Sequence, residues 1–191
     1  GTEVDPQHWL DALQAVIAEI GGLESLAAIS IGGQQHGMVL LDSAGEVIRP
    51  ALLWNDTRSA AQAAAINAAF PDIHQRTGSQ LVASFTASKV RWMADHEPHN
   101  ASRVASIALP HDWLSWQLQG GKNFDTLFTD RSDASGTGYF AADTNVYRRD
   151  LLAIALRDKR DIYLPKIAKF DQFAGVTNSG IPIAAGAGDN A

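Results

Sequence analysis

Hydrophobic residues recur at helical spacing near the start of the chain, directly after Asp5 and Pro6. Asp is a preferred N-cap residue, and Pro is favoured at the first helical position. The apolar stripe consists of Trp9, Leu10, Leu13, Val16, Ile17 and Ile20, and Gly21-Gly22 follow it as a typical helix end. The same kind of pattern predicts further helices over residues 59–70, 86–96, 111–118 and 150–156.

Short apolar runs lie between these helices and predict strands. They cover residues 26–31, 38–41, 51–54, 104–109 and 181–185, and residues 47–48 return after a turn at 42–45 to make a hairpin. Residues 124–140 show no regular period, and we predict that they are irregular. Because strands and helices alternate, the sequence indicates an α/β fold.

The last predicted strand runs into a glycine-rich turn, and the sequence stops at Ala191. A strand followed by such a turn normally continues into a helix. We therefore expect the chain to be a segment of a longer enzyme.

Composition narrows the function classes. Of the 191 residues, 46% are hydrophobic and 19% charged, which fits a soluble globular protein with a core. The net charge is −6 without a cluster of Lys and Arg, which argues against nucleic-acid binding. The absence of cysteine excludes disulfides, thiolate zinc sites and cysteine nucleophiles, and it suits a reducing cytoplasm. No apolar run approaches the roughly 20 residues that span a membrane.

Familiar catalytic motifs are missing as well. The sequence contains no H-E-x-x-H zinc motif, no G-x-S-x-G elbow and no G-x-x-x-x-G-K-[ST] phosphate loop. The candidate chemistry therefore has to come from less specific clusters of polar residues, of which there are four.

The first cluster lies between two predicted strands, where Gln35 and His36 stand among glycines. Amide and imidazole groups suit sugar hydroxyls, because each such hydroxyl both donates and accepts hydrogen bonds. A polar turn with a solvent-exposed histidine is the alternative, and from the residues alone it is the commoner arrangement.

The second cluster follows the run at residues 51–54, where Trp54, Asp56, Thr57 and Arg58 stand close together. Asp56 and Arg58 could bind a ligand, but Asp56 or Thr57 as the N-cap of the next helix is the favoured interpretation. Trp54 could stack on a sugar, although filling the core is the more common role of tryptophan.

The third cluster spans residues 129–138 and is rich in hydroxyls, with Asp130 and Asp133 three residues apart. Such spacing is compatible with a metal site or a turn. The pattern of a calcium-binding loop is absent, so the sequence favours a turn.

The fourth cluster ends the chain, where a predicted strand delivers Asp189 through Gly186 and Gly188. Ligands of α/β folds bind outside the carboxyl ends of strands. Gly186, Gly188 and Ala191 formally match the dinucleotide fingerprint G-x-G-x-x-G/A, which is short and common. The alternative is that Asp189 acts as a catalytic acid or base on an exposed turn.

Six stretches, in order and spanning nearly the whole chain, together resemble the FGGY family of carbohydrate kinases. They are IGGQQHG at 31–37, RPALLWNDTR at 49–58, FTASKVRW at 85–92, LPHDWL at 109–114, TDRSDASGT at 129–137 and AGAGDNA at 185–191. The resemblance implies a ribonuclease-H-like lobe of the actin-like ATPase type, with a mixed sheet flanked by helices. It also implies that residues 1–191 form the N-terminal, sugar-binding lobe.

The resemblance also implies roles for individual residues. Gln35 and His36 would contact the sugar, Asp189 would be the general base, and Asn190 would also touch the sugar. Gln35 stands where the family often has Met. The Gln-x-His-Gly form resembles members that phosphorylate D-xylulose, whereas glycerol kinases carry an Arg-Glu pair at the corresponding place.

The reaction implied is transfer of the γ-phosphoryl group of ATP to D-xylulose, which yields D-xylulose 5-phosphate. ATP and Mg²⁺ would be bound mainly by the family's Asp-x-Gly-Thr phosphate loop and second lobe. Neither appears in this sequence, so the segment alone is expected to be inactive. A kinase for ribulose or a deoxyketose, and a non-catalytic sugar-binding module, remain as alternatives. Family members are often homodimers, and a cytoplasmic location is expected.

Overall fold

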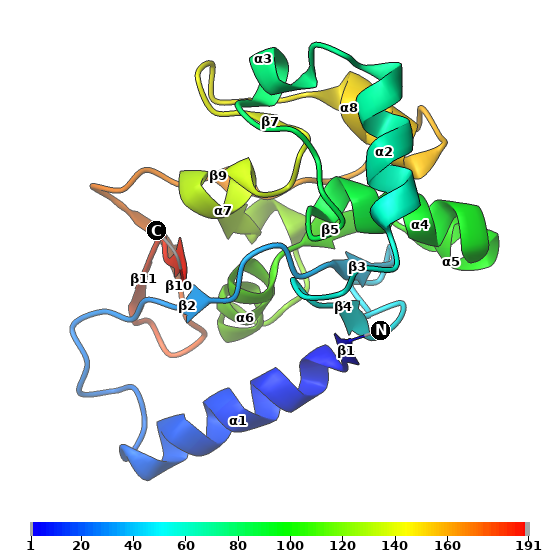
Figure 1. Cartoon of the computed structure of the whole chain (residues 1–191). Coiled ribbons are helices and arrows are strands. Elements are labelled where there is room, and N and C mark those ends of the chain that lie inside the picture. The colour runs from blue at the N-terminus through cyan, green and yellow to red at the C-terminus, as the bar shows by residue number, and fades with distance from the viewer. Residues whose placement is uncertain (1, 190–191) are drawn as a thin grey trace.

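The structure, a computed structural model, describes residues 2–189 (Figure 1). The helices are α1 Pro6–Glu19, α2 Ala60–Ala69, α3 Ile73–Thr77, α4 Thr86–His96, α5 Pro98–Arg103, α6 Pro110–Leu118, the 3-10 helix η1 Phe124–Thr126, α7 Arg131–Ser135 and α8 Arg149–Leu156. The strands are β1 Glu3–Val4, β2 Gly32–Gly33, β3 Val39–Leu41, β4 Ala51–Leu52, β5 Ser106–Ala108, β6 Phe128–Thr129, β7 Phe140–Ala141, β8 Val146–Tyr147, β9 Lys166–Ile167, β10 Phe173–Val176, β11 Pro182–Ala184 and β12 Ala187–Gly188.

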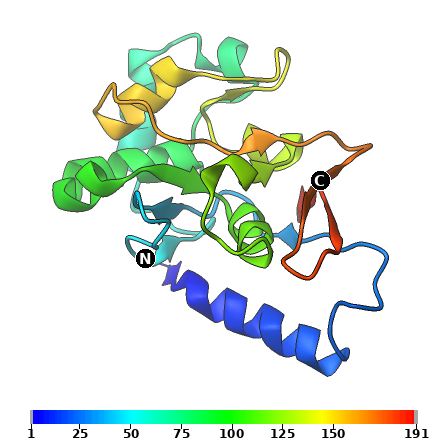
Figure 2. The ribbon, with the colours of Figure 1, turned by 180° about the vertical axis from the view of Figure 1, so that it is seen from behind.

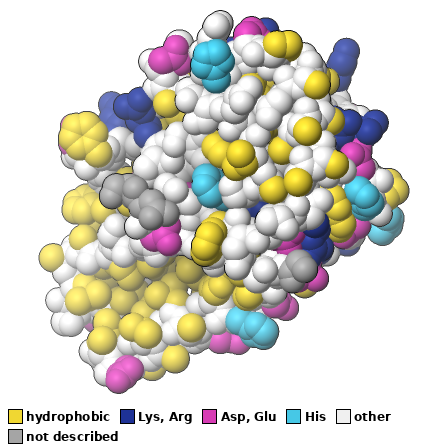
Figure 3. Space-filling view, in the orientation of Figure 1, with side chains coloured by type: hydrophobic (Ala, Val, Ile, Leu, Met, Phe, Trp, Pro, Cys, Tyr) yellow, Lys and Arg dark blue, Asp and Glu magenta, His cyan; other side chains and the backbone are white. Residues whose placement is uncertain are grey.

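The predicted first helix is confirmed as α1. The carboxylate of Asp5 caps it by accepting a hydrogen bond from the backbone N–H of Gln7 at 3.0 Å. The helix lies along one side of the molecule, opposite α2, α3 and α8 (Figure 2). On the face shown in Figure 3, apolar side chains gather at the lower left, where α1 lies, and Val16 and Ile20 of this helix are 55% and 57% exposed.

The strands are short and pair two at a time, in both orientations, so the prediction of a mixed α/β class is confirmed. Strands β3 and β5 pair antiparallel, and β2 and β12 pair parallel. The hairpin after β3 is also confirmed, because the backbone N–H of Ile48 donates to the carbonyl oxygen of Leu40 at 2.9 Å.

The strand predicted at residues 26–31 is wrong. Within this stretch only Ile29 makes a bridge, to Ile183, and the rest consists of turns and irregular backbone. An apolar run becomes a strand only where a neighbouring strand accepts its backbone hydrogen bonds. Ile29 finds such a neighbour beside β11.

Two clusters of buried apolar side chains form the core. The larger packs α2, α4 and α8 against the strands and includes Met38, Leu40, Ile66, Val90 and Leu152. The smaller lies around α6 and includes Val39, Leu41, Trp113 and Trp116. Helix α6 is therefore anchored on its apolar face by the core, and its first turn lies under the site described below.

The prediction that residues 124–140 are irregular is only partly right, because they contain η1, β6 and α7. Strand β6 pairs parallel with β9, and α7 is capped by Asp130. No helix within residues 2–189 is both long enough and apolar enough to cross a lipid bilayer.

Candidate functional site

The parallel pairing of β2 with β12 brings the first and fourth clusters together. Ala187 lies opposite Gly32 and Gly188 opposite Gly33. The backbone N–H of Asp189 extends this ladder by donating to the carbonyl oxygen of Gly33 at 2.8 Å. Asp189 itself is exposed at the end of β12. The proposed base is therefore fixed by its main chain beside the polar turn that follows β2.

Gln35 lies directly against this ladder. A Cβ atom at Gly188 would come within 2.5 Å of both Cγ and Nε2 of Gln35, so only glycine leaves room for the side chain. The amide group of Gln35 thus lies next to the residue that precedes Asp189. The structure brings these two predicted site residues together.

His36 is held by its ring and by its backbone. Its φ angle is +64°, a left-handed conformation that is uncommon for residues other than glycine. Nδ1 lies 2.8 Å from the carbonyl oxygen of Gly136, and the ring lies 5.0 Å from that of Phe85, measured between centroids. A carbonyl oxygen only accepts, so Nδ1 carries the proton, and the neutral ring presents Nε2 as an acceptor.

Burial lowers the pKa of His36, opposed by the hydrogen bond to Gly136. The positive charge of Lys89 lowers this pKa further, whereas the negative charges of Asp133 and Asp189 raise it. The net direction is downward from 6.5, so His36 is neutral at pH 7 and above. A neutral imidazole with a free acceptor nitrogen suits a sugar hydroxyl.

Lys89 holds the backbone of His36 in place, and the sequence analysis does not identify this residue. Its side chain is fully buried, and Nζ donates to the carbonyl oxygen of His36 at 2.7 Å. Burial lowers the pKa of Lys89 to about 7, and the charge of Asp56 raises it. The sequence does contain a signal, because a lysine stands within the apolar part of the helix at 86–96. Lysine is almost never fully buried without a partner, so a lysine at this place implies one.

The second cluster folds differently from the favoured interpretation. Asp56 is buried, and its carboxylate accepts from the backbone N–H of Arg58 at 3.0 Å, from Arg58 Nε at 2.9 Å and from the N–H of Thr2 at 2.5 Å. The prediction that Asp56 or Thr57 caps α2 is wrong, because that helix begins after Ser59. Trp54 is 55% exposed, so the core interpretation is wrong too, and its ring is available to a ligand.

The third cluster forms α7 and joins the site. Asp130 caps this helix by accepting from the backbone N–H groups of Ser132 and Asp133, at 2.7 and 3.2 Å. Ser132 Oγ donates to Asp130 at 2.5 Å and accepts from the backbone N–H of Gly188 at 3.3 Å. The helix thus touches the strand that carries Asp189, and at its other end Gly136 contacts His36. The prediction of a turn is corrected to a short helix.

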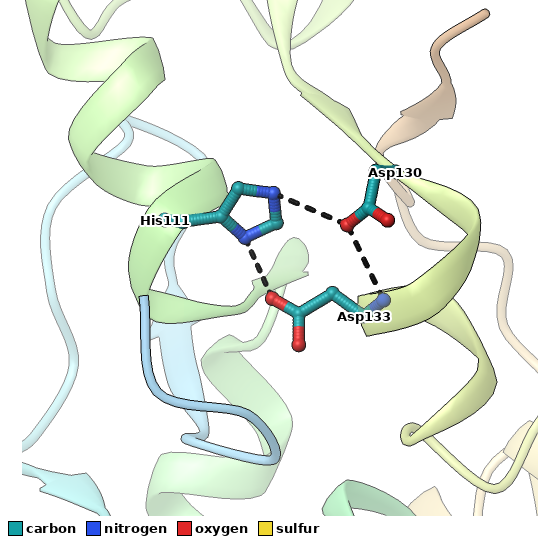
Figure 4. Close-up of side chains that lie close together, drawn as sticks. All are labelled: His111, Asp130 and Asp133. Carbon is teal, nitrogen blue, oxygen red and sulfur yellow. Dashed lines mark hydrogen bonds and ion pairs between the residues drawn. The ribbon is translucent and has the colours of Figure 1, made fainter. Parts of the chain in front are cut away.

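A buried group of charged side chains lies between α6 and α7 (Figure 4). His111 Nδ1 lies 2.6 Å from an oxygen of Asp133 and 3.2 Å from one of Asp112, and Nε2 lies 3.5 Å from one of Asp130. His111 is fully buried, as is Asp133. Sequence analysis missed His111, since a single histidine carries no signal of its buried partners.

Burial alone would lower the pKa of His111, but the charges of Asp112, Asp133 and Asp130 outweigh it, and the pKa rises to about 9. Burial raises the pKa of Asp112 to about 7, opposed by the charge of His111 and assisted by that of Asp133. Burial also raises the pKa of Asp133, against the hydrogen bond and charge of His111. His111 is therefore a cation at neutral pH, and the negative charge of the carboxylates around it compensates its positive charge.

The donors of His111, Asp130 and Asp133 lie within 4.8 Å of one another, close enough to consider a metal ion. However, the two carboxylates face opposite nitrogens of one imidazole ring, so a single ion could not be bound by both carboxylates and the ring (Figure 4). Mg²⁺ also prefers six oxygen ligands in octahedral geometry. These residues do not fit Mg²⁺, and an ion pair explains them.

The FGGY family model, described as the N-terminal domain of FGGY carbohydrate kinases, matches residues 2–191. This chain belongs to the FGGY family of carbohydrate kinases. The match covers the three segments that form the site, which are β2 with the turn after it, α7, and β12 with Asp189. The family uses ATP as phosphoryl donor.

A xylulose kinase of Streptomyces coelicolor is 42% identical to this FGGY chain, over all of the chain and 41% of the relative's length. A crystal structure of xylulose kinase from Bifidobacterium adolescentis matches with a TM-score of 0.94 at 41% identity, over 100% of this chain and 47% of the other. Gluconate kinase from Lactobacillus acidophilus matches with a TM-score of 0.82 at 26% identity, over 98% and 39%. The chain thus spans less than half the length of each of these three relatives.

Asn190 lies outside the described residues, as does Ala191, the last position of the dinucleotide fingerprint. The contact of Asn190 with a sugar therefore stays a prediction. The same holds for the fingerprint, which requires a helix after Gly188.

Proposed function

We propose that this FGGY chain is the sugar-binding lobe, residues 1–191, of a kinase that phosphorylates D-xylulose to D-xylulose 5-phosphate. The observation that carries the proposal is the β2–β12 ladder, which places Asp189 beside Gln35 and His36. Relatives named xylulose kinase at about 40% identity support the choice of sugar.

In the proposed mechanism Asp189 accepts the proton of the attacking sugar hydroxyl. Phosphoryl transfer depends chiefly on positioning and charge neutralisation, and a general base typically adds about 10²–10⁴ in rate. Asp189 suits this role because it is exposed while its backbone is fixed by Gly33.

His36, Gln35 and Asn190 would hold the sugar. The free Nε2 of His36 would accept a hydrogen bond from a sugar hydroxyl, because Nδ1 is already engaged by Gly136. The exposed ring of Trp54 is a further candidate for the sugar pocket. The carboxylate of Asp56, which accepts hydrogen bonds from Arg58 and Thr2, would act on the pocket only through its charge, which raises the pKa of Lys89.

ATP and Mg²⁺ would be the other components of the reaction. They would be bound mainly by the phosphate loop and second lobe that the family resemblance implies. Mg²⁺ would neutralise charge on the phosphates. We further propose a cytoplasmic protein that assembles as a homodimer.

Two alternatives follow from the same site. One is a kinase for another sugar, such as ribulose or a deoxyketose, and the similarity to gluconate kinase adds a sugar acid to the substrates to be tested. The other is a sugar-binding module without turnover. An exposed carboxylate beside the sugar-binding turn favours a kinase, since binding alone requires no base.

The test is ATP-dependent phosphorylation by the full-length protein with D-xylulose, D-ribulose, L-ribulose, gluconate and glycerol. Preference for D-xylulose is expected. Preference for another sugar would overturn the substrate and leave the family, and binding without phosphorylation would favour the module.

Asp189→Asn tests the base, because it keeps the shape of the side chain and removes the proton acceptor. We expect kcat to fall by about 10²–10⁴ while sugar binding persists. Asp161→Asn, which changes an exposed carboxylate, serves as the matched control. Loss of sugar binding with kcat unchanged at saturating sugar would contradict the assigned role.

A further inference from the structure

His111 lies beneath all three segments that form the site. A Cβ atom at Gly33 would come within 3.0 Å of His111 Cβ, and one at Gly186 within 2.6 Å of His111 Cδ2. Gly33 belongs to the ladder as the partner of Gly188, and Gly186 directly precedes β12. The backbone and Cβ atom of His111 therefore pack against β2, and its imidazole packs against the residue that leads into β12.

The other edge of the imidazole faces α7. Nδ1 points to Asp133 within the helix, and Nε2 points to Asp130 at its N-cap (Figure 4). Each ring nitrogen lies at ion-pair distance from a carboxylate, and the negative charges of these carboxylates favour a proton on both nitrogens. His111 is thus a buried cation between two anions of one short helix.

Helix α7 in turn contacts the backbone beside Asp189 and, through its C-cap Gly136, the side chain of His36. Ser132 Oγ accepts from the backbone N–H of Gly188, next to Asp189, and the carbonyl oxygen of Gly136 accepts from His36. A helix of five residues has few backbone hydrogen bonds to hold it in place. Its position relative to the ladder therefore depends on side-chain contacts, of which those with His111 are buried and charged.

We propose that His111 is a positioning residue, whose imidazolium holds α7 against the β2–β12 ladder and so fixes His36 and Asp189 relative to one another. The inference rests on the function proposed above for those two residues. The remaining charged neighbour, Asp112, is on α6 itself and also caps that helix through the backbone N–H of Leu109, at 2.8 Å. Asp112 therefore belongs to the framework of α6, whereas Asp130 and Asp133 form the link to α7.

The first test compares His111→Gln, Asp133→Asn and the double variant in the full-length protein. A shift of about 1 Å at an active site can cost roughly 100-fold in rate. We expect His111→Gln to raise the sugar KM and lower kcat, each by roughly tenfold, with the ATP KM changed less than about twofold. Both single variants break the same ion pair, so the double variant should change the sugar KM no further than His111→Gln alone.

Arg91→Gln is the matched control. It removes a half-buried ion pair with Asp95 within α4, at 3.1 Å. The proposed mechanism gives Arg91 no contact with a ligand. We expect this variant to lower the melting temperature without changing the sugar KM. If His111→Gln behaves like this control, the role of His111 is merely structural and the inference is wrong.

The second test does not depend on the enzymatic activity of any variant. In protein labelled with ¹⁵N in the histidine rings, the signal that disappears in the His111 variant should show both nitrogens protonated at pH 8. A neutral ring at pH 8 would overturn the inference. If the wild-type protein phosphorylates no sugar, the proposed function is wrong. The ring signal, and the coupling of His111 and Asp133 in thermal unfolding, then still test whether His111 is a buried cation.

Discussion

Replacing Gly136 by alanine should damage sugar binding through a single steric contact. Gly136 has a φ angle of −77°, which alanine adopts without strain, so the backbone itself tolerates the change. The added Cβ atom, however, would lie 2.5 Å from both Cε1 and Nδ1 of His36. The effect of the substitution is therefore confined to what happens to the histidine ring.

The size of the effect follows from the distance. Carbon atoms in contact stand about 3.5–4.0 Å apart, so the ring has to move by roughly 1 Å or more. That movement breaks the hydrogen bond from Nδ1 to Gly136, worth about 1 kcal/mol, and pushes the side chain off its rotamer at a cost of about 0.5–1.5 kcal/mol. Since a misplaced Nε2 no longer meets the sugar hydroxyl, we expect the sugar KM to rise roughly tenfold.

The assay is steady-state phosphorylation by the full-length protein, with the sugar and ATP varied separately. The KM for ATP should stay within about twofold, because the contact touches only the sugar side. The control is a cycle with His36→Ala: on that background Gly136→Ala should change the sugar KM little, since the ring it displaces is absent. A full, additive effect of Gly136→Ala in the His36→Ala protein would refute the reasoning.

Two further predictions concern stability. Lys89→Met should remove the 2.7 Å hydrogen bond to the carbonyl oxygen of His36, which then keeps only the longer one from Thr86 at 3.4 Å, and destabilise the protein by about 0.5–1.5 kcal/mol, measured by denaturant unfolding. The pKa of Lys89 is lowered to about 7 in the folded protein. Between pH 7 and about 10 the folded protein therefore binds fewer protons than the unfolded chain, and its stability rises with pH. Lys89→Met should flatten this rise. An equally steep rise in the variant would contradict this assignment. Asp5→Ala removes the cap of α1 and should cost about 0.5–2 kcal/mol with the sugar KM unchanged, and an altered KM would show that α1 is coupled to the site.

Local sequence signals predicted the longer elements well. The cap at Asp5 and the apolar spacing predicted α1, and the regular patterns predicted α4, α6 and α8 within one or two residues. Around Asp130 the sequence favours a turn, because a helix of five residues is too short to show a period. Helices α3 and α5, of five and six residues, escape prediction for the same reason.

The sequence names candidate site residues but does not indicate how they are brought together. Gln35, His36 and Asp189 were identified from motifs, whereas the strands that join them consist of two residues each and contain glycine, so no alternating pattern indicates their pairing. Lys89 and His111 were missed because charged residues are ordinarily assigned to the surface, and only the folded chain shows which carbonyl or carboxylate compensates their burial.

The ladder between β2 and β12 joins its two strands through main-chain atoms, and the last of its hydrogen bonds ends on Asp189 itself. The location of the proposed base therefore does not depend on which side chains occupy the turn at residues 34–36. Evolution or protein engineering can therefore change the side chains that would contact the sugar without moving the carboxylate of Asp189. Under the proposed function, substrate choice and proton transfer would be separable, so a search for altered sugar preference can begin at Gln35 while the position of Asp189 is kept.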